Sequence, residues 1–536
     1  MNKFIHLRHA SVPGQSPGES MLTSLEAGTR TPEGISRFAP GTLRDVAVVG
    51  AGMAGMTTAA RLQARGLSTV VLEAHGQTGG CAGFFTRRGF AFDVGATTLV
   101  DFEPGGLGGE LLESLGMPPV EGEALPGYVA WLPDRKVTLY RNGADWAAER
   151  LNAFGRDRPH REFWCLLDRL SKAFWKASRR GIRLPIRTFP DLLRAARSVD
   201  LRDWPLARFA SWTMRDALQH FGLRDDRPLC GLLSMLIEDT VHSTVDEAPL
   251  VNAALGVTIR GAGLTRARGG MRSFWRTFVA RYRSLGGELA LGARVDRIEG
   301  QEGDFTLHTR RGVFRARHVV SAVPAELTAR LAPLAVREAL RDHVQRNADA
   351  VGGAMIVFLG VPESEVEGQE FTHHQILEDY VKPLGDGNNM FLSVSAPGDR
   401  ESAPEGSRAV MISTHCELAI WENLAPAEHA ERKRAASERL IRLARRVYPD
   451  LGARAVVREA GTPRTYERFT SRPRGAVGGY RLTLANSNQR AIPHDIGVAG
   501  FWLVGDTTWP GLGTVACVLG SRIVAERILT CLPRRS

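Results

Sequence analysis

The stretch Asp45–Ala96, DVAVVGAGMAGMTTAARLQARGLSTVVLEAHGQTGGCAGFFTRRGFAFDVGA, decides the fold of this chain. It opens with an apolar run, Val46–Val49, which predicts a strand buried on both faces. Gly50, Gly52 and Gly55 follow in the pattern G-x-G-x-x-G. The first glycine allows a tight turn, the second lets a pyrophosphate approach the backbone, and the third lets a helix pack closely on the strand.

The residues after these glycines complete a β-α-β unit. Apolar spacing predicts a helix over Met53–Arg65 that stops at Gly66, and then a strand over Thr69–Leu72 that ends at Glu73. A carboxylate at this place accepts hydrogen bonds from the ribose hydroxyls of an adenine dinucleotide and would repel a 2′-phosphate. The order strand, turn, helix, strand, acid therefore predicts a dinucleotide site. The alternative is a structural unit of the same build that has lost its ligand.

The sequence beyond this acid specifies the nucleotide. Gly79 and Gly80 follow it, and Gly89–Gly95 reads GFAFDVG. The span up to Gly80 resembles the extended FAD fingerprint of the glutathione-reductase-like and amine-oxidase-like flavoproteins, with Thr69 where a valine is usual. The longer span GGCAGFFTRRGFAFDVGATTL is similar to the carotenoid desaturase and carotenoid isomerase family, whose members share G-G-C-A and G-F-x-F-D-x-G-A.

Later segments extend the resemblance over residues 46–528. RARGGM at Arg266–Met271 is similar to the family's P-x-G-G-M, with Ala267 in place of proline. Thr372–Gln375 and Gly461–Thr470 resemble carotenoid desaturases and isomerases, and the motif text is closest to that of carotenoid 3,4-desaturases.

Near the C-terminus, a strand is predicted to end in Gly505-Asp506, and a helix to follow the turn around Pro510. This text is similar to the family's G-D-x-x-x-P-G-x-G. The resemblance implies that Asp506 hydrogen-bonds a ribityl hydroxyl of FAD and that the helix points its N-terminus at the flavin N1–C2=O edge. Free N–H groups and partial positive charge there stabilise an anionic reduced flavin. One departure is Gly520-Ser521, where the family has Ser-Gly.

The resemblance implies FAD as the cofactor and assigns its contacts. Val295 corresponds to a residue that meets the adenine through its backbone. The full predicted set is Gly50, Ala51, Gly52, Ala54, Gly55, Glu73, Gly79, Gly80, Gly95, Val295, Gly505, Asp506, Gly513 and Thr514.

No catalytic residue is assigned. Four side chains in family-like segments could approach a substrate, although each type is more often structural. They are His373, His374, His415 and Tyr480.

The predicted fold class is α/β: a Rossmann-like FAD-binding domain of the glutathione-reductase and amine-oxidase type, with an interleaved α+β substrate domain and a helical insert. A chain of 536 residues is long enough for such interlocked domains. We assign residues 1–43 to a disordered extension, 44–110, 266–325 and 481–536 to the FAD-binding domain, and 111–265 and 326–480 to the substrate domain. The insert, within 146–225, has apolar stripes and Arg-rich faces, which suit a substrate tunnel, a membrane surface or plain core.

Charge and cysteine use narrow the partners. Lys and Arg exceed Asp and Glu by 11, yet no basic segment resembles a nucleic-acid module, so a membrane surface is the preferred interpretation. The six cysteines show no paired spacing, which disfavours a metal site and a disulfide framework. The opening twenty residues lack the apolar core of a signal peptide, and no apolar run reaches transmembrane length. We therefore expect a cytoplasmic protein, peripheral on the membrane.

The sequence holds one dinucleotide fingerprint, which disfavours a reductase that takes electrons from NAD(P)H through a second domain. The resemblance implies desaturation of a long apolar polyene, with hydride passing to flavin N5 and electrons passing on to a quinone or oxygen. A carotenoid cis–trans isomerase or a retinol-saturase-like reductase on the same scaffold is the alternative. A flavin amine oxidase is less favoured, because G-G-C-A stands where G-G-R is usual, and so is a flavin-free lipid-binding escort protein.

Overall fold

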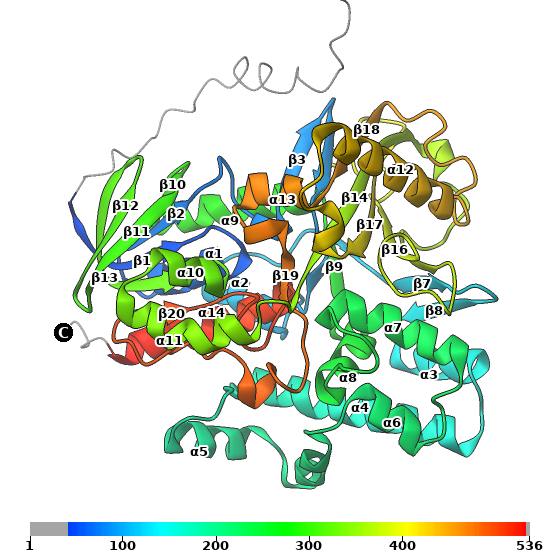
Figure 1. Ribbon diagram of the computed structural model, residues 1–536, viewed down its shortest axis with the longest axis horizontal. Coiled ribbons are helices and arrows are strands. Elements are labelled where there is room, and N and C mark those ends of the chain that lie inside the picture. The colour runs from blue at the N-terminus through cyan, green and yellow to red at the C-terminus, as the bar shows by residue number, and fades with distance from the viewer. Residues whose placement is uncertain (1–40, 532–536) are drawn as a thin grey trace, which may run out of the picture. The chain divides into compact units, whose positions relative to one another are not determined.

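A seven-stranded sheet assembled from distant stretches of the chain forms one half of the fold (Figure 1). Its parallel part runs in the order β10 (Glu288–Leu291), β2 (Thr69–Glu73), β1 (Leu43–Val49), β13 (Gly312–Ser321) and β20 (Phe501–Leu503). The central strand β1 is buried along nearly its whole length, as expected for an apolar strand covered on both faces. The structure, a computed structural model, describes residues 41–531, and almost all of the predicted N-terminal extension lies outside them.

An antiparallel hairpin widens this sheet at one side. It consists of β11 (Val295–Gln301) and β12 (Asp304–Thr309), with β12 paired to β13. The sequence predicts one strand with its approach over residues 287–298, whereas the structure has β10 and β11 as separate strands. Gly292 makes the turn between them with φ +65°, a left-handed conformation that favours glycine.

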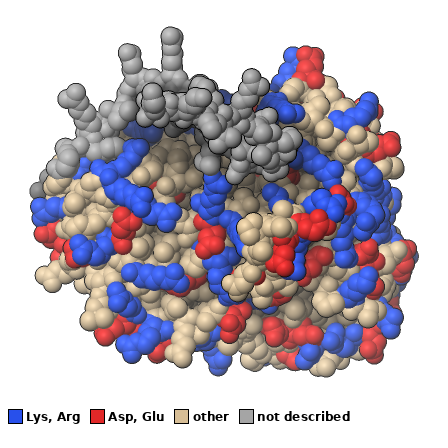
Figure 2. All heavy atoms as spheres, turned by 45° about the horizontal axis from the view of Figure 1, so that its top comes forward, with Lys and Arg blue, Asp and Glu red and all other residues tan. Residues whose placement is uncertain are grey.

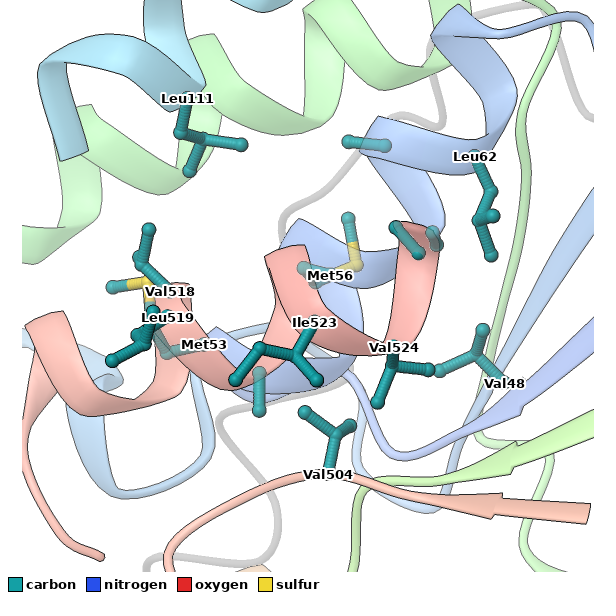
Figure 3. Packing of buried hydrophobic residues seen from close by; sticks show 14 of the residues in the cluster. Val48, Met53, Met56, Leu62, Leu111, Val504, Val518, Leu519, Ile523 and Val524 are labelled. Atoms are coloured by element: carbon teal, nitrogen blue, oxygen red, sulfur yellow. The ribbon is translucent and has the colours of Figure 1, made fainter. Parts of the chain in front are cut away.

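Two helices cover the face of β1 that carries Val46 and Val48. They are α1 (Met53–Ala64) and α14 (Thr514–Cys531), which come from opposite ends of the chain. Figure 3 shows Ile523 of α14 close to Met56 of α1, with the sheet beside them. Residues 53–62 of α1 are all buried, because the helix lies between the sheet and α14. Close packing of α1 on its own strand needs Gly55, whose added Cβ would lie 2.0 Å from the carbonyl oxygen of Gly50.

The second sheet has eight strands in the order β18-β14-β17-β16-β15-β7-β8, with β19 also paired to β14. All pairs are antiparallel except β7 with β15. The strands are β7 (Gly127–Trp131), β8 (Lys136–Tyr140), β14 (Val351–Pro362), β15 (His373–Leu377), β16 (Asn389–Val394), β17 (Ser407–Cys416), β18 (Val457–Gly461) and β19 (Val477–Tyr480).

Strand alternation gives this sheet two different faces. One face packs on α12 (Pro426–Ala444) through residues such as Val357 and Leu392. The other face carries side chains such as Tyr128 and Leu377 and meets the helices of the insert. The side chains available to a substrate on this sheet are therefore those of the second face.

The helical insert is mostly core. Its helices are α3 (Gly143–Ala153), α4 (Arg158–Arg179), α5 (Phe189–Ser198), η3 (Leu201–Phe209), α6 (Met214–His220), α7 (Arg227–Val241) and α8 (Leu250–Thr258). The apolar stripes of α4, α6, α7 and α8 pack together in one buried cluster. Of the three interpretations of these stripes, plain core holds for those four helices, and α5 with η3 differs from them.

Shorter elements connect the two sheets. They are α2 (Leu107–Ser114), β3 (Phe84–Arg87), β4 (Phe90–Asp93), β5 (Leu99–Val100), β6 (Gly122–Ala124), β9 (Leu264–Ala267), α9 (Gly270–Ser284), α10 (Ala325–Leu331), α11 (Leu334–Arg346) and α13 (Pro463–Thr470). Among the helices of residues 41–531, none combines the length and hydropathy needed to cross a bilayer. On the face drawn in Figure 2, basic and acidic side chains are interspersed.

Candidate cofactor site

Three parallel strands end at the same edge of the seven-stranded sheet. Val49 of β1 pairs with Ser321 of β13, and Ser321 pairs with Leu503 of β20. The chain continues this register, because Ala322 N–H donates to the Val49 carbonyl at 2.9 Å and Val504 N–H donates to the Ser321 carbonyl at 2.9 Å. The glycine loops that follow β1 and β20 therefore start at the same edge of the sheet, one on each side of the end of β13. The carboxyl edge of such a sheet is where ligands of these folds bind.

The first glycine loop is held by backbone hydrogen bonds. Gly50 N–H donates to the Leu72 carbonyl at 2.8 Å, and Gly79 N–H donates to the Ala51 carbonyl at 2.9 Å. Gly52 and Gly79 also form an isolated parallel β-bridge. The loop after β1 and the Gly79 segment thus form one fixed wall of the site.

Gly52 is the position that the protein's own packing does not explain. It is the N-cap of α1 with φ −74° and ψ −178°, a conformation open to any residue. A Cβ added there would meet nothing closer than the Gly79 carbonyl oxygen at 4.0 Å. Gly513, ahead of α14, has no atom within 4 Å of an added Cβ either, although its φ of +106° favours glycine on its own. Open space at the N-terminus of α1 fits a pyrophosphate, which the helix N–H groups attract.

Glu73 forms a polar corner at the end of β2. Its Oε2 accepts from the Ala51 N–H at 2.6 Å, and its Oε1 accepts from the His75 N–H at 2.8 Å. Burial raises the pKa of this carboxyl, although the backbone N–H groups oppose the shift. Each carboxylate oxygen keeps a second lone pair, which can accept from a ribose hydroxyl. The Glu73 carbonyl accepts from Ala293 N–H at 2.7 Å, which brings the start of β11 at Val295 to this corner.

Replacing Glu73 by Ala should weaken FAD binding about 10- to 100-fold, because the hydrogen bonds that the ribose hydroxyls donate to the Glu73 carboxylate are lost. The bound fraction can be measured from flavin absorbance after dialysis at a series of FAD concentrations. Glu110→Ala is the matched control, since Glu110 also holds α1, through Arg61 at 2.7 Å, but lies on α2 away from the corner. Equal flavin retention in the two variants would contradict the assignment of Glu73.

The segment with the text G-G-C-A forms the short 3-10 helix η2 (Gly80–Ala82), whose surroundings require glycine at positions 79 and 95. Gly79 has φ +121°, and an added Cβ would lie 2.5 Å from the Cα of Gly83. A Cβ on Gly95 would lie 2.3 Å from the Cys81 carbonyl oxygen. Trp275 of α9 fixes this short helix by donating from Nε1 to the Ala82 carbonyl at 2.7 Å. Gly80 lies against the first glycine loop, since its added Cβ would lie 3.3 Å from the Cα of Gly52. We call the region between this loop and the loop that follows β20 at Gly505 the cradle.

At the other end of the cradle, Asp506 pairs with Arg472. The two side chains are only 15% and 13% exposed. Burial would lower the pKa of Arg472, but the Asp506 carboxylate raises it above its usual value. The backbone of Gly479 in β19 packs on the Asp506 carbonyl oxygen, which would lie 2.1 Å from an added Cβ. Arg472 is missing from the predicted set, because nothing in the sequence marks which arginine of the basic group 464–474 reaches Asp506.

The first turns of α1 and α14 meet in this region. The Cys517 thiol lies against the backbone of Ala54, and burial raises its pKa to about 12. Thr514 at the start of α14 accepts a hydrogen bond through Oγ1 from Val100 N–H at 3.3 Å. The structure thus brings the predicted residues from both ends of the chain to one edge. Residues 41–531 contain no cluster of three or more metal-ligating side chains.

A cavity of about 960 Å³ lies between α7 and the second sheet. Glu238, His242 and His415 line it, together with apolar residues such as Leu377. His415 Nδ1 lies 3.3 Å from Glu238 Oε2, and the His242 and His415 ring centroids are 4.5 Å apart. Burial would lower the pKa of His415, but the Glu238 carboxylate raises it; burial lowers the pKa of His242 far below its usual value.

This cavity borders the cofactor edge through β19. An added Cβ on Gly478 would lie 2.0 Å from His242 Cε1, and the next residue, Gly479, packs on Asp506. Strand β19 therefore separates the His242 and His415 pair from the Asp506 side of the cradle.

The other three side chains that the sequence offers as possible substrate contacts, His373, His374 and Tyr480, are engaged in contacts within the protein. His374 lies on the opposite face of the sheet, where its ring nitrogens face Trp131 and Tyr448, and burial lowers its pKa to about 4. His373 is buried and stacks on Tyr128 with ring centroids 5.1 Å apart. Tyr480 donates to Glu326 at 3.0 Å. Of the four, His415 is the one that lines the cavity.

Relatives of known name resemble this chain over most of its length. Prolycopene isomerase of Arabidopsis thaliana is 24% identical over 96% of this chain and 86% of its own. A lycopene-forming phytoene desaturase of Paracoccus is 24% identical over 90% of this chain and 97% of its own. The resemblance to carotenoid desaturases and isomerases is confirmed.

Solved structures show the same fold. Putrescine oxidase superimposes with a TM-score of 0.60 at 17% identity, covering 91% of this chain and 99% of that one. Cyclohexylamine oxidase from Brevibacterium oxydans has a TM-score of 0.56 at 18% identity, covering 91% and 100%. The predicted α/β fold of the amine-oxidase type is confirmed.

The family model for flavin-containing amine oxidoreductases matches residues 53–529, from the start of α1 to near the end of α14, which is well over half of the chain. The chain belongs to the flavin-containing amine oxidoreductase family and is an FAD-dependent oxidoreductase.

Proposed function

We propose that this enzyme introduces double bonds into a carotenoid or a similar long polyene. The observation that carries the proposal is the similarity to a phytoene desaturase over 90% of this chain and 97% of the relative, which spans both cofactor and substrate parts. The text G-G-C-A at residues 79–82 agrees with that group of relatives rather than with the amine oxidases.

A carotenoid cis–trans isomerase is the second candidate. It is favoured by the equal identity, 24%, to a prolycopene isomerase over 96% of this chain. The two candidates differ in whether the product has lost hydrogen. A retinol-saturase-like reductase would add hydrogen to the same class of substrate.

We propose the FAD contacts that the family resemblance implies, and the open space at Gly52 and the free lone pairs of Glu73 support them. Gly52 and the first turn of α1 take the pyrophosphate, Glu73 takes the adenosine ribose, and the backbone at Val295 meets the adenine. Asp506, oriented by Arg472, takes a ribityl hydroxyl.

The remaining predicted residues shape this path: Gly50, Ala51, Ala54, Gly55, Gly79, Gly80 and Gly95 on the first wall, and Gly505, Gly513 and Thr514 at the start of α14.

When bound, FAD supplies the hydride acceptor of the reaction. The protein's own residues bind and orient FAD and the substrate, and they exclude water from the site. The first turn of α14 would offer helix N–H groups to the flavin, where they would favour negative charge. The buried Arg472 stays charged beside Asp506 and fixes the direction of that carboxylate. Electrons are proposed to leave for a quinone or oxygen, because the sequence holds one dinucleotide fingerprint.

The test is to incubate the FAD-loaded enzyme with liposomes that contain polyenes of different saturation, with oxygen or a quinone present. Desaturation gives longer-wavelength absorbance and a product that lacks two hydrogens per new bond. Isomerisation leaves the mass unchanged and shifts the chromatographic retention. Turnover of an amine but of no polyene would overturn the proposal.

We further propose that the enzyme works in the cytoplasm as a peripheral membrane protein, because a long polyene resides in the bilayer. The net excess of 11 basic residues agrees with binding of the enzyme to an anionic membrane surface. A nucleic-acid partner is not part of the proposal.

A further inference from the structure

The segment α5–η3, residues 189–209, exposes an unusual amount of apolar surface. Five of the eleven exposed large apolar side chains of residues 41–531 lie within it. Their exposed fractions are 69% for Phe189, 51% for Leu192, 39% for Leu193, 80% for Leu201 and 52% for Trp204. We call these five side chains the apolar patch. Scattered exposed apolar residues are ordinary, but a group of this size on one short segment marks an interaction surface.

Helix α5 is amphipathic in the reverse sense of a surface helix on a soluble protein. Its buried residues are Asp191, Ala195 and Ser198, whereas its leucines face outward. Asp191 pairs with Arg527 of α14 at 3.1 Å and accepts from Thr188 Oγ1 at 2.8 Å. Polar contacts thus fasten α5 to the molecule and leave its apolar side free.

Neighbouring elements hold this orientation firmly. Arg183 pairs with Glu526 at 2.6 Å, and Lys176 and Arg180 both pair with Asp200 just ahead of η3. Figure 1 shows α5 at the lower left edge of the ribbon, away from the strands of both sheets. The outward position of the patch is therefore built into the fold.

Basic side chains surround the patch. Residues 176–208 contain nine Lys and Arg against three Asp. Two of those three Asp, at 191 and 200, are already paired with Arg or Lys. Arg187, Arg197, Arg202 and Arg208 are exposed within the segment or at its start. The combination is an apolar centre with a positively charged rim.

We infer that the α5–η3 segment docks on the headgroup region of an anionic lipid bilayer. Phe189, Leu192, Leu201 and Trp204 enter the boundary between headgroups and acyl chains, where Trp is favoured. The arginines of the rim meet the lipid phosphates. The rim carries charge of one sign, nine Lys and Arg against three Asp, and this charge is complementary to the phosphates of an anionic bilayer, which favours a bilayer as the occupant.

Docking at this surface also brings the bilayer toward the cofactor half of the molecule. Helix α4, which leads into α5, places Phe174 against Trp509 with ring centroids 6.2 Å apart. Trp509 lies between Asp506 and Gly513 in the C-terminal loop of the cradle. The inference does not rest on the proposed polyene activity, because vesicle binding is measured without turnover.

The test is co-sedimentation of the full FAD-loaded protein with vesicles of phosphatidylcholine alone or mixed with phosphatidylglycerol. The wild type should bind the mixed vesicles more tightly, and added salt should weaken the binding. Leu201→Glu with Trp204→Glu should lower the partition coefficient at least about tenfold, because two inserted apolar side chains become charged. Arg197→Gln with Arg202→Gln should lower binding to the mixed vesicles only.

The matched control is Leu334→Glu with Val381→Glu, at positions 64% and 77% exposed on other elements. It should bind vesicles like the wild type. All four sites are exposed, so thermal melts and flavin content should not change in either pair of variants. Equal vesicle binding by the patch and control variants would overturn the inference. A wild-type protein that does not co-sediment with the mixed vesicles would also overturn it. A dimer that the patch variants convert to a monomer would assign the surface to a second copy of the chain instead.

The polyene assay in detergent micelles separates this inference from the proposed function. The patch variants should retain turnover in micelles and lose it in liposomes. A wild type that binds vesicles but converts no polyene would leave the docking surface standing and refute the proposed substrate.

Discussion

Gly52→Ala should fold like the wild type and purify with clearly less bound FAD. An added methyl at this N-cap meets no protein atom closer than 4.0 Å, and the backbone there is in an ordinary conformation. The same methyl would occupy the space next to the α1 N-terminus into which the pyrophosphate must come. Overpacking of this kind costs about 1–3 kcal/mol, which weakens FAD binding about 10- to 100-fold.

Gly143→Ala is the matched control, because Gly143 also stands at a helix start and has no atom within 4 Å of an added Cβ. It should keep its flavin and be equally or more stable. Gly55→Ala is the opposite case: its methyl would lie 2.0 Å from the Gly50 carbonyl oxygen, so the fold itself should suffer. Flavin titration and thermal melts of the three apoproteins distinguish these outcomes. A Gly52→Ala protein that keeps its full flavin content would contradict the placement of the cofactor.

Asp506→Ala should lose both flavin and stability. The substitution removes the proposed ribityl contact and leaves the guanidinium of Arg472 buried without its partner. Removal of one member of a buried ion pair costs about 3–5 kcal/mol, which should appear as a lower free energy of unfolding in urea.

A second variant separates the two effects. In Asp506→Ala with Arg472→Met no charge is left unpaired, so much of the stability should return. FAD binding should stay weak, because the carboxylate is still missing. Recovery of flavin along with stability would mean that Asp506 acts on the fold alone.

The cofactor half could be predicted from the sequence because its signals are local. Strand, glycine turn, helix and acid follow one another within residues 46–73, and each is specified by neighbours in the chain. Long-range partners have no such signal. Arg472 lies 34 residues from Asp506 and reaches it only because β19 and the C-terminal loop pack together.

Two further features depended on tertiary context. His373 and His374 are adjacent in β15, so they face opposite sides of the sheet, and only the packing of the sheet decides which of them faces which side. Phe189, Leu192 and Leu193 of α5 have the i, i+3, i+4 spacing of a core helix, and periodicity does not tell which side of a helix turns inward. Its partner on the buried side is α14, more than 300 residues later, through Asp191 and Arg527.

The order in which the strands of the first sheet occur along the chain has a consequence for synthesis. Strand β20 and helix α14 are translated long after β1 and α1, yet β20 completes the parallel sheet beside β13 and α14 packs on α1. Until α14 has emerged, Val48 and Met56 lack the α14 side chains that share their buried cluster, and the second glycine loop is not yet held in place. During synthesis the polypeptide therefore exposes this apolar surface, which makes it prone to aggregation until it can fold and bind its flavin.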